Sequence, residues 1–216
     1  MRIGIELNGV LRDTLGKIEQ IYRKNYLNDE NLDSYKTYEI DLSGNTEEII
    51  NEDTFKYEIN LPIVTNDLQN HFKFKTQEDL YSFLYQEFPM EIFGHAGSVE
   101  TATFNYFNDF YLKYRDTAEI LVVSDEIGKS KPASLFFLSK FGCLTEKIKF
   151  YSLITLSTLW DEVDVLVTAN NNLITNCPKD KIIIKYNTTY NTFLPCKYQI
   201  NSLKELDSVI ETISLS

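Results

Sequence analysis

Polar side chains that could bind a ligand or react follow three apolar runs of the sequence, at the point where each run ends. Glu6 and Asn8 lie in "IELNGVL", and Ser124 closes "LVVS". A carboxylate at the end of a buried apolar run is costly unless it is paired or has a function, so Glu6 is the strongest candidate. The third run, "VDVLVTA", is followed by Asn170 and Asn171, whose amides could hydrogen-bond a ligand.

The elements around these residues predict how they come together. Short, continuous apolar runs indicate buried strands at residues 2–7, 119–124, 147–153, 163–169 and 181–186. Helical patterns lie between or after them, at residues 12–26, 76–88, 99–113, 133–142 and 202–213. Apolar strands that alternate with helices indicate a parallel sheet covered on both faces. The sequence therefore predicts an α/β fold with a Rossmann-like parallel sheet and helices on both faces.

The carboxyl ends of the predicted strands are where a ligand site is expected. In open parallel sheets, ligands bind outside these ends, at the point where the strand order reverses. Residues 6–9, 124–126 and 168–172 all lie at predicted strand ends. We therefore expect these three segments to converge.

The order and spacing of these segments resemble the haloacid dehalogenase (HAD) superfamily, and most closely its 5'-nucleotidase or deoxyribonucleotidase branch. That family opens with Asp-x-Asp-Gly-Val/Thr-Leu-x-Asp/Ser, which residues 6–13 match except that Glu6 and Asn8 stand in place of the two acids. "LVVS", "KSKPASLFFLSKFG" and "DVLVTANNN" occupy the places of the second, third and fourth motifs. The resemblance implies a HAD-like core and a cap insertion, formed by residues 1–26 with 99–216, and by residues 27–98.

The first motif decides what the resemblance implies about catalysis. In the family, the first aspartate attacks phosphorus to form an aspartyl-phosphate and also ligates Mg²⁺. Glu6 keeps the charge, but its extra methylene moves the carboxylate by about 1.5 Å, one carbon–carbon bond, and a misplacement of about 1 Å can cost roughly a hundredfold in rate. The second aspartate is a general acid and base, a role in which Asn8 cannot exchange a proton. Neither residue is therefore predicted to be catalytic.

The fourth motif bears on the metal. Mg²⁺ is usually held by carboxylates in near-octahedral geometry, whereas Asn170 and Asn171 offer only neutral amides, in a run that is also typical of a turn. Asp125 and Glu126 are the nearby acids that could compensate, and Glu6 could touch a cation. No metal site or cofactor is therefore predicted, and Mg²⁺ is expected only if hydrolysis survives.

The sequence retains the family's phosphate-binding groups better than its catalytic and metal-binding acids. Ser124 could donate a hydrogen bond to a phosphate oxygen, and Lys131 could supply the positive charge, with Lys129 as an alternative. If the Phe-Leu pair at 137–138 matches the aromatic–leucine pair of the nucleotidases, the lysine position falls on Ser134 instead. The sequence leaves these three alignments open.

Three functions follow from this interpretation. The first is a catalytically degenerate, 5'-nucleotidase-like protein (a pseudoenzyme) that acts as a binding or assembly module, because three acidic motif positions are exchanged. The second is a Mg²⁺-dependent phosphohydrolase of nucleoside monophosphates that uses Glu6. The third is a nucleotide or phosphate sensor without hydrolysis, in which aromatic residues between 72 and 110 could stack on a base.

The composition narrows the class of partner. The formal net charge is -11 with a pI near 4.7 and no basic cluster, so nucleic acid is not an expected ligand. No apolar run approaches the roughly 20 residues that span a bilayer, and no secretory signal pattern opens the chain. The three cysteines are widely spaced, and the two histidines exclude a His-rich metal site. We expect a soluble, cytoplasmic protein whose partner is another protein or a small phosphorylated ligand, with no membrane contact.

Overall fold

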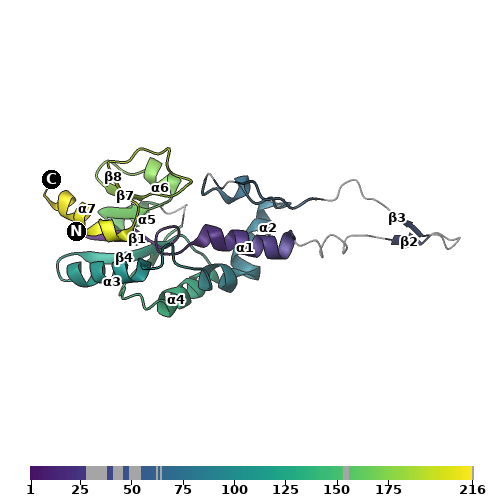
Figure 1. Ribbon diagram of the computed structural model, residues 1–216, viewed down its shortest axis with the longest axis horizontal. Coiled ribbons are helices and arrows are strands. Elements are labelled where there is room, and N and C mark those ends of the chain that lie inside the picture. The colour runs from purple at the N-terminus through teal and green to yellow at the C-terminus, as the bar shows by residue number, and fades with distance from the viewer. Residues whose placement is uncertain are drawn as a thin grey trace.

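A parallel sheet of six strands forms the centre of the molecule (Figure 1). The computed structural model describes residues 1–27, 38–40, 46–48, 55–61, 63, 65–152 and 156–215. Across the sheet the order is β5-β4-β1-β6-β7-β8. These strands are β1 Arg2–Glu6, β4 Glu119–Ser124, β5 Ile148–Phe150, β6 Val165–Thr168, β7 Ile182–Tyr186 and β8 Tyr198–Ile200. The predicted α/β fold class is confirmed.

Strand β1 lies in the interior of the sheet, and its residues from Ile3 to Glu6 are all buried. It pairs with β4 from Arg2 to Glu6 and with β6 from Ile3 to Ile5, in parallel on both sides. The chain adds β4 and β5 on one side of β1 and then returns to add β6, β7 and β8 on the other. The strand order therefore reverses at β1, which is the position where open α/β sheets bind ligands.

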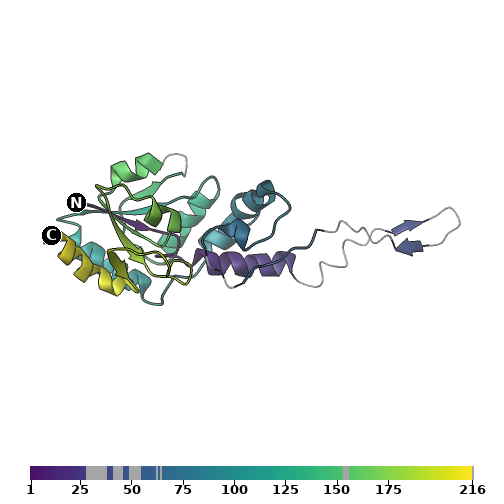
Figure 2. The ribbon, with the colours of Figure 1, turned by 90° about the horizontal axis from the view of Figure 1, so that it is seen from above.

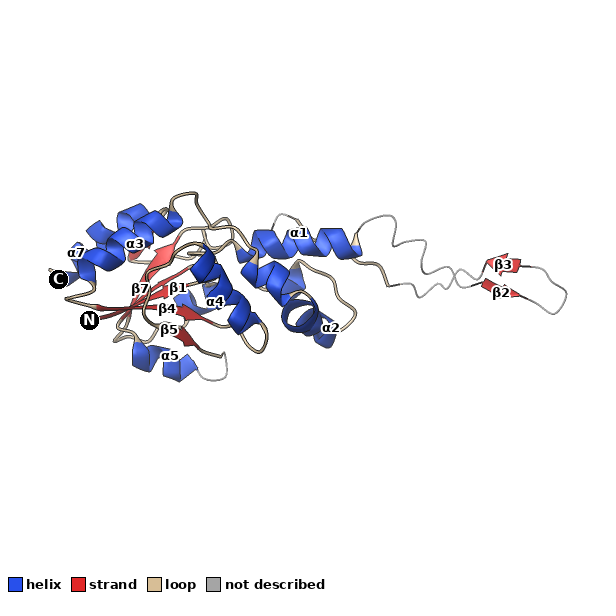
Figure 3. Cartoon of the chain, turned by 90° about the horizontal axis from the view of Figure 1, so that it is seen from below, coloured by secondary structure: helices blue, strands red, loops and turns tan. Residues whose placement is uncertain are grey.

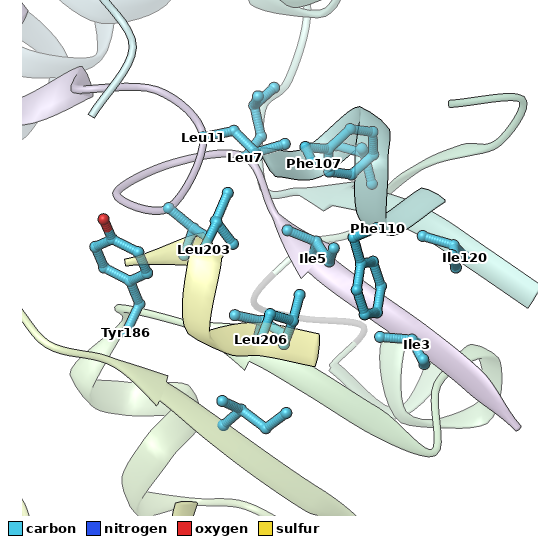
Figure 4. Close-up of a cluster of buried hydrophobic side chains, with 14 of the residues drawn as sticks. Ile3, Ile5, Leu7, Leu11, Phe107, Phe110, Ile120, Tyr186, Leu203 and Leu206 are labelled. Atoms are coloured by element: carbon cyan, nitrogen blue, oxygen red, sulfur yellow. The ribbon is translucent and has the colours of Figure 1, made fainter. Parts of the chain in front are cut away.

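Helices cover both faces of the sheet (Figure 3). On one face, α3 (Thr103–Tyr114) and α7 (Leu206–Ser214) pack on β1, and Figure 4 shows Phe107, Phe110 and Leu206 against Ile3 and Ile5. On the other face, α5 (Leu156–Glu162) packs its buried side chains against β4 and β6. The remaining core helices are α4 Ser130–Lys140, α6 Asn171–Thr175 and the 3-10 turn Leu203–Glu205.

A second hydrophobic cluster surrounds α1 (Thr14–Tyr26). Figure 2 shows this helix beside the sheet, seen from above. Ile18 and Tyr22 of α1 pack against Phe72 and Phe83, and Tyr22 and Phe72 are both at most 1% exposed. The segment that supplies these aromatic residues contains Leu68–Asn70, α2 Gln77–Ser82 and two short π-helical turns, Phe83–Glu87 and Met90–Gly94. β2 (Tyr38–Ile40) and β3 (Thr46–Glu48) form a separate antiparallel pair.

The element predictions were mostly confirmed, with local exceptions. The predicted helix at 76–88 is α2 followed by a π-helical turn, and the three-residue strand β8 and helix α5 were not predicted. The Asn-rich run is the start of helix α6 rather than a turn alone. Much of the predicted cap insertion, residues 28–37, 41–45, 49–54, 62 and 64, lies outside the described residues. None of the helices in the described ranges is long and apolar enough to cross a membrane.

Candidate functional site

The three predicted strand ends converge at the carboxyl edge of the sheet. Thr168, at the end of β6, and the backbone of Ala169 both donate hydrogen bonds to Glu6, at the end of β1. Asn8 donates to Asp125 and Glu126, the two residues that follow β4. Sequence reasoning therefore placed these segments correctly, because parallel pairing of β1 with both neighbours leaves their carboxyl ends adjacent.

The Glu6 carboxyl is buried and already has protein partners on both oxygens. Its Oε2 accepts hydrogen bonds from Thr168 Oγ1 and, at 3.3 Å, from the Ala169 amide, and its Oε1 accepts from Tyr151 Oη at 3.3 Å. Only 1% of Glu6 is exposed. Burial, followed by the nearby charge of Asp125, raises the pKa of Glu6 to about 8. Folding therefore favours the protonated form of this carboxyl compared with the unfolded chain.

Both polar atoms of the Asn8 amide have hydrogen-bond partners. Its Nδ2 donates to Asp125 Oδ1 at 2.9 Å and to Glu126 Oε1 at 3.0 Å. Its Oδ1 accepts from Arg12 Nη2 and from Thr14 Oγ1, both at 2.6 Å. An aspartate here would place three carboxylates together, so the amide is the side chain that satisfies this arrangement.

Arg12 is the functional group that sequence reasoning missed. Its side chain is fully buried, and Nη2 forms an ion pair with Glu126 Oε1. Its Nη1 donates to Ser134 Oγ and to the Phe93 carbonyl, both at 2.8 Å. The guanidinium carbon lies 5.1 Å from the ring centre of Phe93 and 5.3 Å from that of Phe137. The available signal was a single arginine in "GVLRDT", directly after the apolar residues Val10 and Leu11.

The predicted phosphate-binding residues lie in different environments. Ser124 is fully buried, and within the described part of the chain its Oγ has no hydrogen-bond partner. Lys131 is exposed, and its Nζ lies 5.4 Å from the ring centre of Phe150 rather than at the convergence of strand ends. Ser134, the alternative for the lysine position, faces Arg12. The positive charge beside Ser134 therefore comes from the first loop of the chain.

The asparagines of the fourth motif form hydrogen bonds with backbone groups. Asn170 is the N-cap of α6, and its Oδ1 accepts from the amides of Asn172 and Leu173 at 2.9 and 3.4 Å. Asn171 Nδ2 donates to the Tyr190 carbonyl at 3.1 Å. A further asparagine that sequence reasoning did not single out, Asn191, is fully buried and donates to the carbonyls of Ala169 and Tyr186.

A cavity of about 290 Å³ opens at this edge of the sheet, between the strand ends and the segment from Asn66 to Phe93. Four carboxyl-bearing residues line it, Glu6, Asp13, Asp125 and Glu126. No lysine or arginine belongs to the lining over the ranges that the structure describes. The larger apolar side chains of the lining are Leu68, Leu84, Tyr85, Phe93 and Tyr190.

These residues do not fit the Mg²⁺ that the resemblance to the HAD superfamily implies. Mg²⁺ needs ionised oxygen ligands with free lone pairs, but Glu6 is held by three donors and its pKa is raised to about 8. Asn170 Oδ1 accepts from two backbone amides. Asn171 Oδ1 has no hydrogen-bond partner among the described residues, but it is a neutral amide oxygen, whereas Mg²⁺ is usually held by carboxylates. Within the described ranges, no three His, Cys, Asp or Glu side chains are grouped so that they could hold a metal ion.

Comparison with known proteins gives a match in structure only. No model of a known protein family matches the chain, and no curated protein sequence matches it. A crystal structure of a protein described as a haloacid dehalogenase-like hydrolase, from Burkholderia xenovorans LB400, superposes with a TM-score of 0.57. It has 9% sequence identity, over 99% of this chain and 98% of that chain. At this identity the likeness concerns the fold: this chain has the α/β fold of a haloacid dehalogenase-like hydrolase.

Proposed function

We propose that this chain is a ligand-binding protein with a HAD-like fold that does not carry out phosphoryl transfer. The state of Glu6 is the observation that carries the proposal. A nucleophilic carboxylate must be ionised and must direct a free lone pair at phosphorus. Glu6 instead accepts hydrogen bonds on both oxygens and has a pKa of about 8. The carboxyl is used to join β1 to the turn after β6.

The neighbouring groups support the same proposal. Asn8 links the first loop to Asp125 and Glu126, and Arg12 forms a buried ion pair with Glu126. A general acid must give up and regain a proton, which the Asn8 amide does not do. These side chains form a continuous network that stabilises the convergence of the strand ends and leaves the cavity beside it.

The division of the chain into a core and a cap is part of the same proposal, and so is the likeness of the core to the 5'-nucleotidase branch. We assign residues 1–26 and 99–216 to a 5'-nucleotidase-like core and residues 27–98 to a cap. The position of the cavity supports this division, because its lining includes Glu6 and Asp125 from one part and Tyr85 from the other. In this arrangement the described segment from Asn66 to Phe93 forms one wall of the ligand cavity.

Ser124 favours a second candidate function, the hydrolysis of nucleoside monophosphates. Its hydroxyl is buried and has no hydrogen-bond partner among the described residues. In this candidate the hydroxyl would bind a phosphate oxygen, Lys131 would approach from α4, and Mg²⁺ would bind at Glu6. The lack of a cation in the described cavity lining weighs against it, because a phosphate would face four acids.

Phosphate release decides between the two candidates. A panel of nucleoside monophosphates with Mg²⁺ would be tested with the wild type, Glu6→Gln and Glu6→Ala. Glu119→Gln is the matched control, because Glu119 starts β4 at the opposite edge of the sheet. We expect the four proteins to release phosphate at the same background rate. Release by the wild type and the control that Glu6→Gln and Glu6→Ala abolish would contradict the proposal and establish a phosphohydrolase.

A further inference from the structure

The charge of the cavity wall is the first observation about its ligand. Glu6, Asp13, Asp125 and Glu126 contribute carboxyl groups to the wall, and the only basic side chain that contacts them in the described structure is Arg12, through Glu126. Even with Glu6 protonated, acids outnumber this cation. A wall with this balance attracts positive charge and repels phosphate.

Glu126 supplies an independent observation. Its side chain is 1% exposed and lines the cavity, and its Oε1 is shared by Arg12 and Asn8. Its other oxygen, Oε2, has no hydrogen-bond partner within the described ranges. A buried carboxylate oxygen without a donor destabilises the folded protein. A donor supplied by a ligand would remove this cost.

The aromatic residues favour an organic cation rather than a bare metal ion. Tyr85 and Phe93 line the cavity and stack on each other, with ring centres 5.8 Å apart and planes 6° apart. Tyr85 lines the cavity together with Asp125 and Glu126, and burial, followed by the charges of these two acids, raises the pKa of its hydroxyl. Aromatic faces next to carboxylates are the surroundings that bind ammonium and guanidinium groups.

Arg12 shows that this environment already holds one organic cation. Its guanidinium is paired with Glu126 and lies over the rings of Phe93 and Phe137. We propose that the cavity binds a second one: a small organic cation with a primary ammonium or guanidinium group, held by Asp125 and Glu126 beside Tyr85. This inference rests on the proposed function, because it names the ligand class of the same cavity. The volume of about 290 Å³ is at the lower limit of ligand pockets, about 300 Å³, so the ligand is small.

Calorimetric titration of the full chain tests this inference. The probe is 1,4-diaminobutane, with 1,4-butanediol as its neutral counterpart and inorganic phosphate as an anion, all at pH 7 and one ionic strength. We expect the diamine to bind and the other two not to bind. Equal binding of the diol would overturn the role of charge, and binding of phosphate without the diamine would overturn the proposed ligand class. No binding of the diamine to folded protein would also overturn it.

Two matched variants locate the binding site. Asp125→Asn keeps an oxygen that accepts from Asn8 and removes one charge from the wall. Asp109→Asn removes the same charge from an exposed position on α3. We expect Asp125→Asn to weaken diamine binding about tenfold or more, as for the loss of a charge-assisted hydrogen bond, and Asp109→Asn to leave it unchanged. Equal weakening by both variants would overturn the site.

The same protein samples separate failure of this inference from failure of the proposed function. Phosphate release that depends on Glu6, without diamine binding, would contradict both the proposed ligand class and the proposed function. Diamine binding that Asp125→Asn weakens, with no phosphate release, supports both. A folded wild type that neither binds the diamine nor releases phosphate would overturn the ligand class alone. Melting curves of each variant without ligand establish that it is folded.

Discussion

The two ends of the parallel sheet carry ionic groups of the same types in opposite environments. At the amino end, Arg2 pairs with Asp164 at 2.8 Å and Lys147 pairs with Glu119 at 2.7 Å, and all four side chains are more than a third exposed. At the carboxyl end, the ion pair of Arg12 with Glu126 is at most 1% exposed. Water screens the exposed pairs at the amino end, so they contribute little to the stability of the fold. The pair at the carboxyl end is costly to bury and more costly to break.

This difference shows where the polar groups of the molecule determine its structure. At the amino end, the exposed ion pairs lie where the strands begin. At the carboxyl end each polar group depends on another, from Thr14 through Asn8 to Glu126. A single substitution there leaves several buried groups without partners, so its effect should far exceed that of a substitution at the amino end.

The largest effect is expected from Arg12→Met. The change leaves Glu126, Asn8 and Ser134 without their buried donor, and breaking a buried ion pair typically costs about 3–5 kcal/mol. Urea denaturation measures the free energy of unfolding. Arg23→Met, in an exposed pair with Glu19 on α1, is the control. Equal losses of unfolding free energy in the two variants would show that the buried pair contributes no more to stability than the exposed one.

A double variant refines this prediction. Arg12→Met combined with Glu126→Leu removes both charges, so it should cost less than the sum of the two single changes. Additive losses would mean that the two side chains act independently, against the ion pair that the structure shows.

Next in size is the pH dependence of Glu6→Gln. The folded-state pKa of Glu6 is about 8, against an ordinary value of 4.5. The folded protein therefore binds more protons than the unfolded chain, and the wild type loses stability as the pH rises between these values. Glutamine resembles the protonated carboxyl, so the variant should gain roughly 2–4 kcal/mol relative to the wild type from pH 4.5 to pH 9. A constant difference across this range would contradict the raised pKa.

A smaller effect is expected from Asn191→Ala. The buried amide donates to the carbonyls of Ala169 and Tyr186, which the variant would leave without this donor. The cost should be about 1–3 kcal/mol, again from urea denaturation. Asn201→Ala, an exposed amide, should cost far less and serves as the control.

The smallest effect is expected at the amino end. Lys147→Gln removes the exposed pair with Glu119, and the urea midpoint should not change measurably in 0.15 M salt. A shift as large as that of Asn191→Ala would show that the two ends of the sheet do not differ in the way proposed.

The fold was predictable in the parts where local pattern carries the signal. The strands β1, β4, β6 and β7 are continuous apolar runs, and their alternation with helices indicated a parallel sheet. β8 gave no such signal, because it is a three-residue edge strand and only Ile200 is fully buried. Asn170 was ambiguous, because asparagine is favoured both in turns and at helix N-caps.

The site divides in the same way. The residue types Glu6 and Asn8, and the meeting of three strand ends, follow from the sequence, because they depend on the order of strands and on a short local motif. The long-range partners of Arg12, which are Phe93, Glu126 and Ser134, do not, because they lie 81, 114 and 122 residues further along the chain. Burial and pairing of a long charged side chain depend on which distant groups the fold brings within hydrogen-bond distance. The burial of Glu6 and its closeness to Asp125, which raise the pKa of this carboxyl, were therefore decided by tertiary packing.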